Sequence, residues 1–180
     1  MRNPRLVITI LLLAMAEVML SFAARQATPD ATLQAQLKRV FPGATSFSAK
    51  QPGPPPHFVA YSGDPSSTTI AGYVFWTTEA EPLERGYDGP IKMLVGMDTK
   101  GILTGVLVTE HREPYGYFSV EPPKFAQQFK NKDIRDPFKV GADVDAVSTA
   151  TITINSSTRA IRNGARRVAR AFLTPPGTTK

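Results

Sequence analysis

The sequence predicts an α+β fold, with an antiparallel sheet around a central hairpin and flanking helices. Alternating apolar residues on both sides of a short turn predict the hairpin, over residues 91–109. Apolar residues at helical spacing predict helices near residues 31–40, 122–130 and 156–172. An apolar content of 42% in 180 residues is enough for one domain with a hydrophobic core.

The first 27 residues have the pattern of an export segment. Arg2 and Arg5 precede an apolar run over residues 6–24, which is typical of a signal peptide or a membrane anchor. Small residues at its end and the acidic Glu17 favour cleavage, whereas its length favours retention as an inner-membrane anchor. In both cases the basic end stays in the cytoplasm, so we expect residues 28–173 to form an exported, periplasmic domain. A buried helix of a cytosolic protein is the remaining alternative.

The exported part begins with a predicted helix over residues 31–40. Leu33, Leu37 and Val40 recur at helical spacing, and Asp30 is a suitable N-cap. Pro42-Gly43 then ends the helix. The proline-rich stretch over residues 52–56 cannot lie inside a helix or strand, so we expect a rigid loop there.

The predicted sheet begins at Thr69 with a run of apolar and aromatic residues that ends at Trp76. Residues 86–90 have the composition of a turn. The hairpin follows, with its turn at residues 98–101. Its alternating residues are Ile91, Met93, Val95 and Met97 before the turn, and Ile102, Thr104, Val106 and Val108 after it.

The last third of the chain predicts two helices joined by a short strand. Pro122-Pro123 can start a helix whose one face has Phe125 and Phe129. A strand through Phe138 and Val140 follows. The final helix buries Ile161, Ala165, Val168 and Phe172 and exposes a row of arginines, Arg159, Arg162, Arg166 and Arg170. We expect residues 174–180 to be a disordered tail.

The composition excludes several kinds of site. The chain has no Cys, which excludes disulfides, thiolate-bound zinc and iron–sulfur clusters, and we predict no metal site. The net charge of +6 fits ordinary solubility, and aromatic residues do not alternate with Lys or Arg in the way that stacks bases. We therefore expect no nucleic-acid partner, and any redox role has to come from a bound organic cofactor.

The stretch over residues 145–157 is the strongest candidate for a functional site. It has six hydroxyl side chains behind the acidic Asp145, and it leads into the predicted last helix. Thr favours strands and Ser and Asn favour helix caps, so a buried strand or a cap is the structural alternative. The spacing Asp145-x-x-Ser148-x-Ala150-Thr151 is more specific than this composition.

That spacing resembles the flavinylation motif of the FMN-binding domain family. In this family a separate flavin transferase moves FMN from FAD onto the last threonine as a phosphoester. The resemblance implies Thr151 as the acceptor, with Ala150, Thr149, Ser148 and Asp145 as the surrounding motif residues, FMN as the cofactor and a flavin transferase as the maturation partner. Many members have Gly where this chain has Thr149, whose branched side chain narrows the available backbone conformations.

A helix that starts near Ser156 or Ser157 would supply positive potential to the attached phosphate through its free amides. A Thr hydroxyl is a weak nucleophile without a base or metal. With two His and no Cys in the chain, self-modification is not expected, and an external transferase is implied.

Further segments are similar to the flavin-binding domain that begins nitrous oxide reductase accessory proteins of the NosR type. These segments are residues 86–91, 98–105, 110–114, 41–44 and 165–170. The likeness implies a periplasmic electron-transfer domain that supports a respiratory chain such as nitrous oxide reduction, with membrane or periplasmic redox proteins as partners. In those larger proteins transmembrane helices and a ferredoxin-like part follow this domain, and we do not expect them in this chain.

The loop over residues 110–118 is expected to cover the flavin. Glu110, His111 and Tyr115 are its candidate cofactor-binding residues, and an aromatic ring of this loop could stack on the isoalloxazine. A lone histidine after a strand is otherwise usually a surface or hydrogen-bonded residue.

An electron-transfer flavoprotein is therefore the leading expectation, ahead of a stand-alone enzyme, and we predict no catalytic residues. A non-redox assembly or binding module for a periplasmic reductase is the first alternative, because Thr149 departs from the motif. A reductase that acts directly on a small molecule is the second, although the sequence offers no acid–base pair for it.

Overall fold

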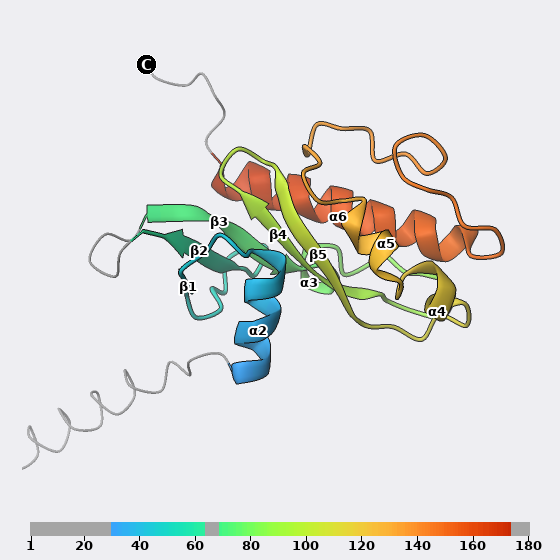
Figure 1. Cartoon of the computed structure of the whole chain (residues 1–180), viewed down its shortest axis with the longest axis horizontal. Helices are drawn as coiled ribbons and strands as arrows, with labels where there is room; N and C mark the ends of the chain where they lie inside the picture. The colour runs from blue at the N-terminus through green and yellow to red at the C-terminus, as the bar shows by residue number, and fades with distance from the viewer. Residues whose placement is uncertain (1–29, 64–68, 174–180) are drawn as a thin grey trace, which may run out of the picture. The chain divides into compact units, whose positions relative to one another are not determined.

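The computed structural model describes residues 30–63 and 69–173 (Figure 1). The predicted export segment over residues 1–27 and the predicted tail over 174–180 lie outside the described residues. One antiparallel sheet has its strands in chain order: β1 (Ser46–Phe47), β2 (Phe58–Ser62), β3 (Thr69–Trp76), β4 (Lys92–Asp98) and β5 (Leu103–Glu110). The helices are α2 (Ala31–Val40), α3 (Thr77–Ala80), α4 (Gly116–Ser119), α5 (Pro123–Gln127) and α6 (Thr151–Phe172). The predicted α+β class is confirmed.

The sheet has a hydrophobic core on each face, because its central strands send successive side chains to opposite sides. In β3, Tyr73 and Phe75 join the core that α6 covers, while Val74 and Trp76 join the core that α2 covers. Figure 1 shows α6 running along the sheet and α2 packed at its other side. Covering both faces explains why β3 and β4 are apolar at nearly every position.

The end of α2 packs closely on the sheet at a pair of glycines. Gly96 and Gly105 face each other in β4 and β5. A Cβ on Gly96 would lie 2.6 Å from the carbonyl oxygen of Val40, and a Cβ on Gly105 would lie 2.9 Å from it. The Thr104 hydroxyl donates a hydrogen bond of 2.7 Å to the same oxygen. The two glycines therefore allow the end of α2 to contact the strands, where the Val40 carbonyl accepts the hydrogen bond from Thr104.

The predicted hairpin is confirmed as strands β4 and β5. Two residues of its turn, Asp98 and Gly101, explain why the chain turns there. The amides of Lys100 and Ile102 each donate a hydrogen bond of 2.8 Å to one carboxylate oxygen of Asp98. Gly101 has a φ of 84°, a conformation that glycine adopts without steric cost. The helix predicted over residues 31–40 is confirmed as α2.

The predicted start of the last helix was wrong. α6 begins at Thr151, not at residue 156. The β-branched residues of its first turn favour strands in isolation, but Thr153 and Ile154 are buried against the rest of the fold, and such packing overrides local preference. The Ser156 hydroxyl donates to the Thr153 carbonyl at 3.0 Å, which satisfies a buried polar group inside the helix.

The predicted strand through Phe138 and Val140 was also wrong. Val140 makes only an isolated bridge to Val144, and Phe138 has a φ of 51°. The Asp143 carboxylate holds this loop together: it accepts from the amides of Phe138, at 3.0 Å, and of Lys139, and it pairs with Lys132 at 2.9 Å. The preceding helix is shorter than predicted, although Phe125 and Phe129 are buried on one side as expected.

The arginine row of α6 is only partly a solvated face. Arg159 pairs with Glu84, and Arg166 donates to the carbonyls of Ile134 at 2.7 Å and Asp136 at 2.8 Å. These contacts hold neighbouring loops against the helix. No helix within the described ranges combines the length and apolarity required to cross a bilayer.

Candidate functional site

Thr151 is the first residue of α6, and its side chain is exposed. Ala150 occupies the N-cap position, and no side chain caps the helix. The first helical hydrogen bond runs from the Ile154 amide to the Ala150 carbonyl at 3.0 Å. The amides of residues 151–153 therefore precede the helical ladder, and the positive end of the helix dipole lies at the turn that begins with Thr151. Such a helix end favours a bound phosphate.

Thr149 adopts the backbone conformation that glycine prefers. Its φ is 68°, in the left-handed region that branched residues rarely enter. The cost of this conformation is about 1–2 kcal/mol. The Thr149 hydroxyl donates to the carbonyl of Ser148 at 2.6 Å. The loop before Thr151 thus keeps a left-handed turn at this position despite the threonine.

A cavity of about 300 Å³ lies beside Thr151. Around it, three apolar or aromatic side chains are strongly exposed: Tyr87 by 70%, Tyr115 by 48% and Ile152 by 54%. Exposed aromatic groups beside a cavity can contact a planar ring. The lining comes from three separate segments and consists of Tyr87, Pro114, Tyr115 and residues 149–153.

Glu113 connects these three segments through hydrogen bonds of its side chain. It was not among the site residues that we predicted from the sequence. Only 6% of it is exposed. Its carboxylate accepts hydrogen bonds of 2.9 Å from the amides of Tyr87 and Asp88, and another from the Thr153 hydroxyl. Burial on its own would raise the pKa of Glu113, but these hydrogen bonds outweigh burial and hold the pKa below its ordinary value. The group is therefore ionised at neutral pH.

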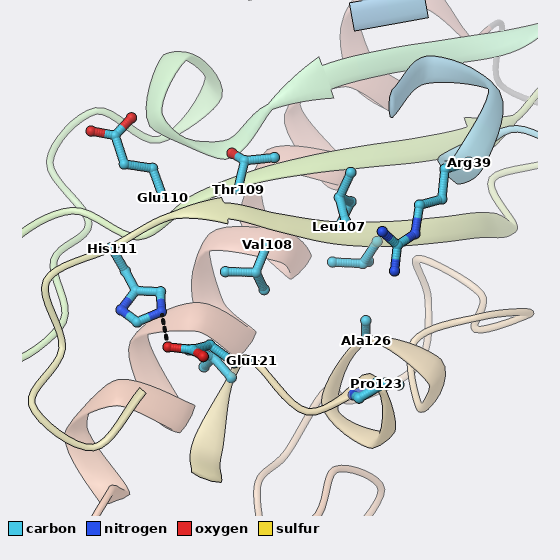
Figure 2. Close-up of a pocket in the computed structure, with 11 residues that line it drawn as sticks. Arg39, Leu107, Val108, Thr109, Glu110, His111, Glu121, Pro123 and Ala126 are labelled. Carbon is cyan, nitrogen blue, oxygen red and sulfur yellow. Dashed lines mark ion pairs between the residues drawn. The ribbon is translucent and has the colours of Figure 1, made fainter. Parts of the chain in front are cut away.

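His111 and Glu110 lie at a different cavity. Figure 2 shows His111 beside Glu121, at one end of a cavity of about 560 Å³ along β5. Nδ1 of His111 accepts from the Glu113 amide at 3.1 Å, and Nε2 lies 3.2 Å from Oε1 of Glu121. Glu110 is exposed, with its carboxylate 3.7 Å from the Lys92 ammonium. Neither residue lines the cavity beside Thr151, and His111 reaches that site only through the backbone of Glu113.

Two residues of the predicted motif also lie outside the cavity. Asp145 pairs with Lys124 at 2.9 Å, and its amide donates to Gln128 at 2.8 Å. These contacts direct Asp145 toward α5, where it lines a third cavity. Ser148 is exposed, and its carbonyl accepts from Thr149. Of the eight predicted site residues, the structure brings Thr149, Ala150, Thr151 and Tyr115 together.

Comparison with known proteins relates part of the chain to a known family. Residues 86–166 match the family model of the FMN-binding domain. The chain is similar to the subunit designated G of the ion-translocating oxidoreductase complex. It is 33% identical to the Haemophilus influenzae (strain PittEE) protein over 114 residues, which cover 58% of this chain and 51% of that protein. It is 32% identical to the Vibrio vulnificus (strain YJ016) protein over 88 residues, 43% of this chain and 42% of that protein. The chain spans about half the length of the Haemophilus influenzae protein. The region that matches the family model, residues 86–166, includes every residue that lines the cavity beside Thr151.

Proposed function

We propose, from the match of residues 86–166 to the family model of the FMN-binding domain, that this chain is an electron-transfer domain whose FMN is attached covalently to Thr151. When bound, FMN supplies one-electron and two-electron redox chemistry, and the protein sets its position and its potential. The observation that supports the attachment is an exposed threonine hydroxyl at the first position of a long helix, beside a cavity with aromatic walls.

The residues around Thr151 fit a phosphate and a planar ring. The amides at the start of α6 would hold the phosphate, since no side chain caps them. Tyr87, Tyr115 and Ile152 offer exposed apolar surface for the ring. Pro114 and residues 149–151 also line the cavity.

The attachment requires a separate flavin transferase. The Thr151 oxygen would form a bond to the FMN phosphorus of FAD, the bond from that phosphorus to the bridging oxygen would break, and AMP would leave. The hydroxyl proton has to pass to a base. The residues that line the cavity include no His, Asp, Glu or Lys, and both ring nitrogens of His111 face other partners. The base is therefore assigned to the transferase.

The proposed setting is a membrane-associated respiratory chain. Similarity to a component of an ion-translocating oxidoreductase complex supports redox proteins as partners. The export pattern of residues 1–27 supports a periplasmic location, with the segment either cleaved or kept as an anchor over residues 6–24. A link to nitrous oxide reduction depends on the sequence resemblance described above.

A flavin-free assembly module is the alternative that the Thr149 substitution suggested. The left-handed backbone at Thr149 argues against it, since this position keeps a φ of 68°, which glycine adopts without steric cost. A colourless protein after production with an active flavin transferase would favour the assembly module.

The proposal is tested by intact mass and visible spectrum after production with and without a flavin transferase. We expect a mass increase equal to FMN minus water, and a flavin spectrum that survives denaturation, only with the transferase. Thr151→Ala should lose both signals, while Thr149→Ala, which removes the neighbouring hydroxyl in the same cavity, should keep them. Equal flavin content in Thr151→Ala and the wild type would refute the attachment site.

A further inference from the structure

We propose that Glu113 is the positioning residue of the flavin site: its buried carboxylate holds the Tyr87–Asp88 turn and the first turn of α6 in the arrangement that admits the flavin to Thr151. This inference rests on the proposed function. It adds a residue that neither the motif nor the lining of the cavity identifies.

The two carboxylate oxygens of Glu113 accept hydrogen bonds from different segments that line the cavity. Oε1 accepts from the Asp88 amide at 2.9 Å, and Oε2 accepts from the Tyr87 amide at 2.9 Å and from the Thr153 hydroxyl. Tyr87 and Thr153 both line the cavity, and Pro114 follows Glu113 directly in the third wall. One carboxylate therefore connects all three walls.

The neighbouring residues are suited to this contact. A Cβ on Gly86 would lie 2.4 Å from Oε1 of Glu113, so only glycine at this position admits the carboxylate to the turn. The Gly86 amide donates to the Gly89 carbonyl at 2.7 Å, which closes the turn that presents the two amides. The Glu113 backbone is held in turn by Nδ1 of His111. A Cβ on Gly116 would lie 2.1 Å from Cε1 of that ring, so this glycine leaves space for the histidine.

Glu113 acts through other residues, because its own side chain does not line the cavity. Hydrogen bonds to an ionised acceptor are about twice as strong as neutral ones. Without them, the Tyr87–Asp88 turn would lose two bonds, and the Thr153 hydroxyl would lose its acceptor two residues from Thr151. The cavity would then be free to change shape although the sheet and both cores stay intact.

Asp143 provides a matched control for this role. It also accepts from two successive amides, those of Phe138 and Lys139, and it also holds a loop. It does not line the cavity beside Thr151. Asp143→Asn should therefore lower stability in the same way as Glu113→Gln without affecting the flavin site.

The test compares the full chain with Glu113→Gln, Asp143→Asn, Thr153→Val and Thr153→Ser. In the flavin-free proteins, amide hydrogen exchange of Tyr87 and Asp88 is measured together with circular dichroism. Loss of a charge-assisted hydrogen bond should speed this exchange about tenfold in Glu113→Gln. The rate of FMN transfer to Thr151 is then followed by intact mass with FAD and a fixed amount of transferase.

We expect Glu113→Gln and Thr153→Val to accept FMN about tenfold more slowly than the wild type, while Asp143→Asn accepts it at the wild-type rate. Thr153→Ser keeps the hydroxyl and should restore most of the rate. A wild-type rate in Glu113→Gln, or an equal slowing in Asp143→Asn, would overturn the positioning role. If the wild-type chain accepts no FMN, the proposed function itself fails, and the amide exchange of the flavin-free variants still decides whether Glu113 holds the turn.

Discussion

The Thr153 hydroxyl donates a hydrogen bond to the Glu113 carboxylate, which lies 40 residues earlier in the chain. This bond connects the first turn of α6, where FMN is proposed to attach, with the loop that follows β5. The same carboxylate accepts the amides of Tyr87 and Asp88. The shape of the cavity beside Thr151 thus depends on a buried ionised group, and this dependence has measurable consequences.

The first consequence is a pH dependence of stability. The pKa of Glu113 is lower in the folded protein than its ordinary value, so its stabilising contribution is full above the ordinary value. The contribution is lost as the pH falls through the folded pKa. We expect Glu113→Gln to lower the free energy of unfolding by about 1–3 kcal/mol at neutral pH, with a smaller difference in acid. Denaturant titrations across the pH range measure it.

Glu110→Gln is the control for this pH dependence. Glu110 is exposed, and its nearest cation, Lys92, is 3.7 Å away. Its substitution should change the free energy of unfolding by less than about 0.5 kcal/mol at every pH. A difference between wild type and Glu113→Gln that stays constant from neutral to acid pH would show that the ionised form of Glu113 is not the stabilising one.

The second consequence concerns the flavin potential. A fixed negative charge behind the cavity wall disfavours added electrons, so the wild-type potential should be lower than that of Glu113→Gln. Spectroelectrochemical titration of the loaded proteins measures the difference, with Asp143→Asn expected to match the wild type. An unchanged or lower potential in Glu113→Gln would contradict the effect of this charge.

A third prediction follows from the left-handed backbone of Thr149. At such a position glycine removes about 1–2 kcal/mol of backbone strain from the folded state. It also raises the conformational entropy of the unfolded chain, which lowers stability by about 0.4–1 kcal/mol. Thr149→Gly should therefore raise the free energy of unfolding by roughly 0.5–1 kcal/mol, while Thr149→Ala should not. Thermal and denaturant unfolding of the two variants measure the effect. If Thr149→Gly lowers the free energy of unfolding as much as Thr149→Ala does, the backbone at Thr149 is not strained.

A fourth prediction concerns the contact between α2 and the sheet. A Cβ on Gly96 would lie 2.6 Å from the Val40 carbonyl oxygen, whereas a Cβ on Gly43 would meet no atom within 4 Å. Gly96→Ala should therefore lower the free energy of unfolding by about 1–3 kcal/mol, and Gly43→Ala should change it by less than about 1 kcal/mol. Equal stability of the two variants would show that the helix end does not need the glycine.

The sequence predicted those elements whose signals are local. The helix over residues 31–40 has a regular apolar spacing and a Pro-Gly stop. The turn at residues 98–101 has Asp and Gly at the positions that its hydrogen bonds require. In both places one short stretch contains all the information that the structure uses, and both predictions are confirmed.

The elements that the sequence did not predict depend on packing and side-chain contacts that no short sequence pattern reveals. α6 starts at an alanine N-cap, where the usual Ser, Thr, Asp or Asn is missing. The loop around Phe138 follows the side chain of Asp143 rather than its own preference. The segment around Glu113 did not reveal the role of its carboxylate, because its partners, Tyr87, Asp88 and Thr153, come from two other segments. Gly86 leaves space for the Glu113 carboxylate in the structure, but a single glycine in the sequence does not identify such a partner.

The most direct test of the attachment site is to locate FMN in the loaded protein by tandem mass spectrometry. Digestion with trypsin releases a peptide over residues 140–159, which contains every hydroxyl residue of the motif. We predict that fragment ions place the added mass on Thr151 alone. Added mass on Ser148, Thr149 or Thr153, or none in a chain that was produced with an active flavin transferase, would contradict attachment at Thr151.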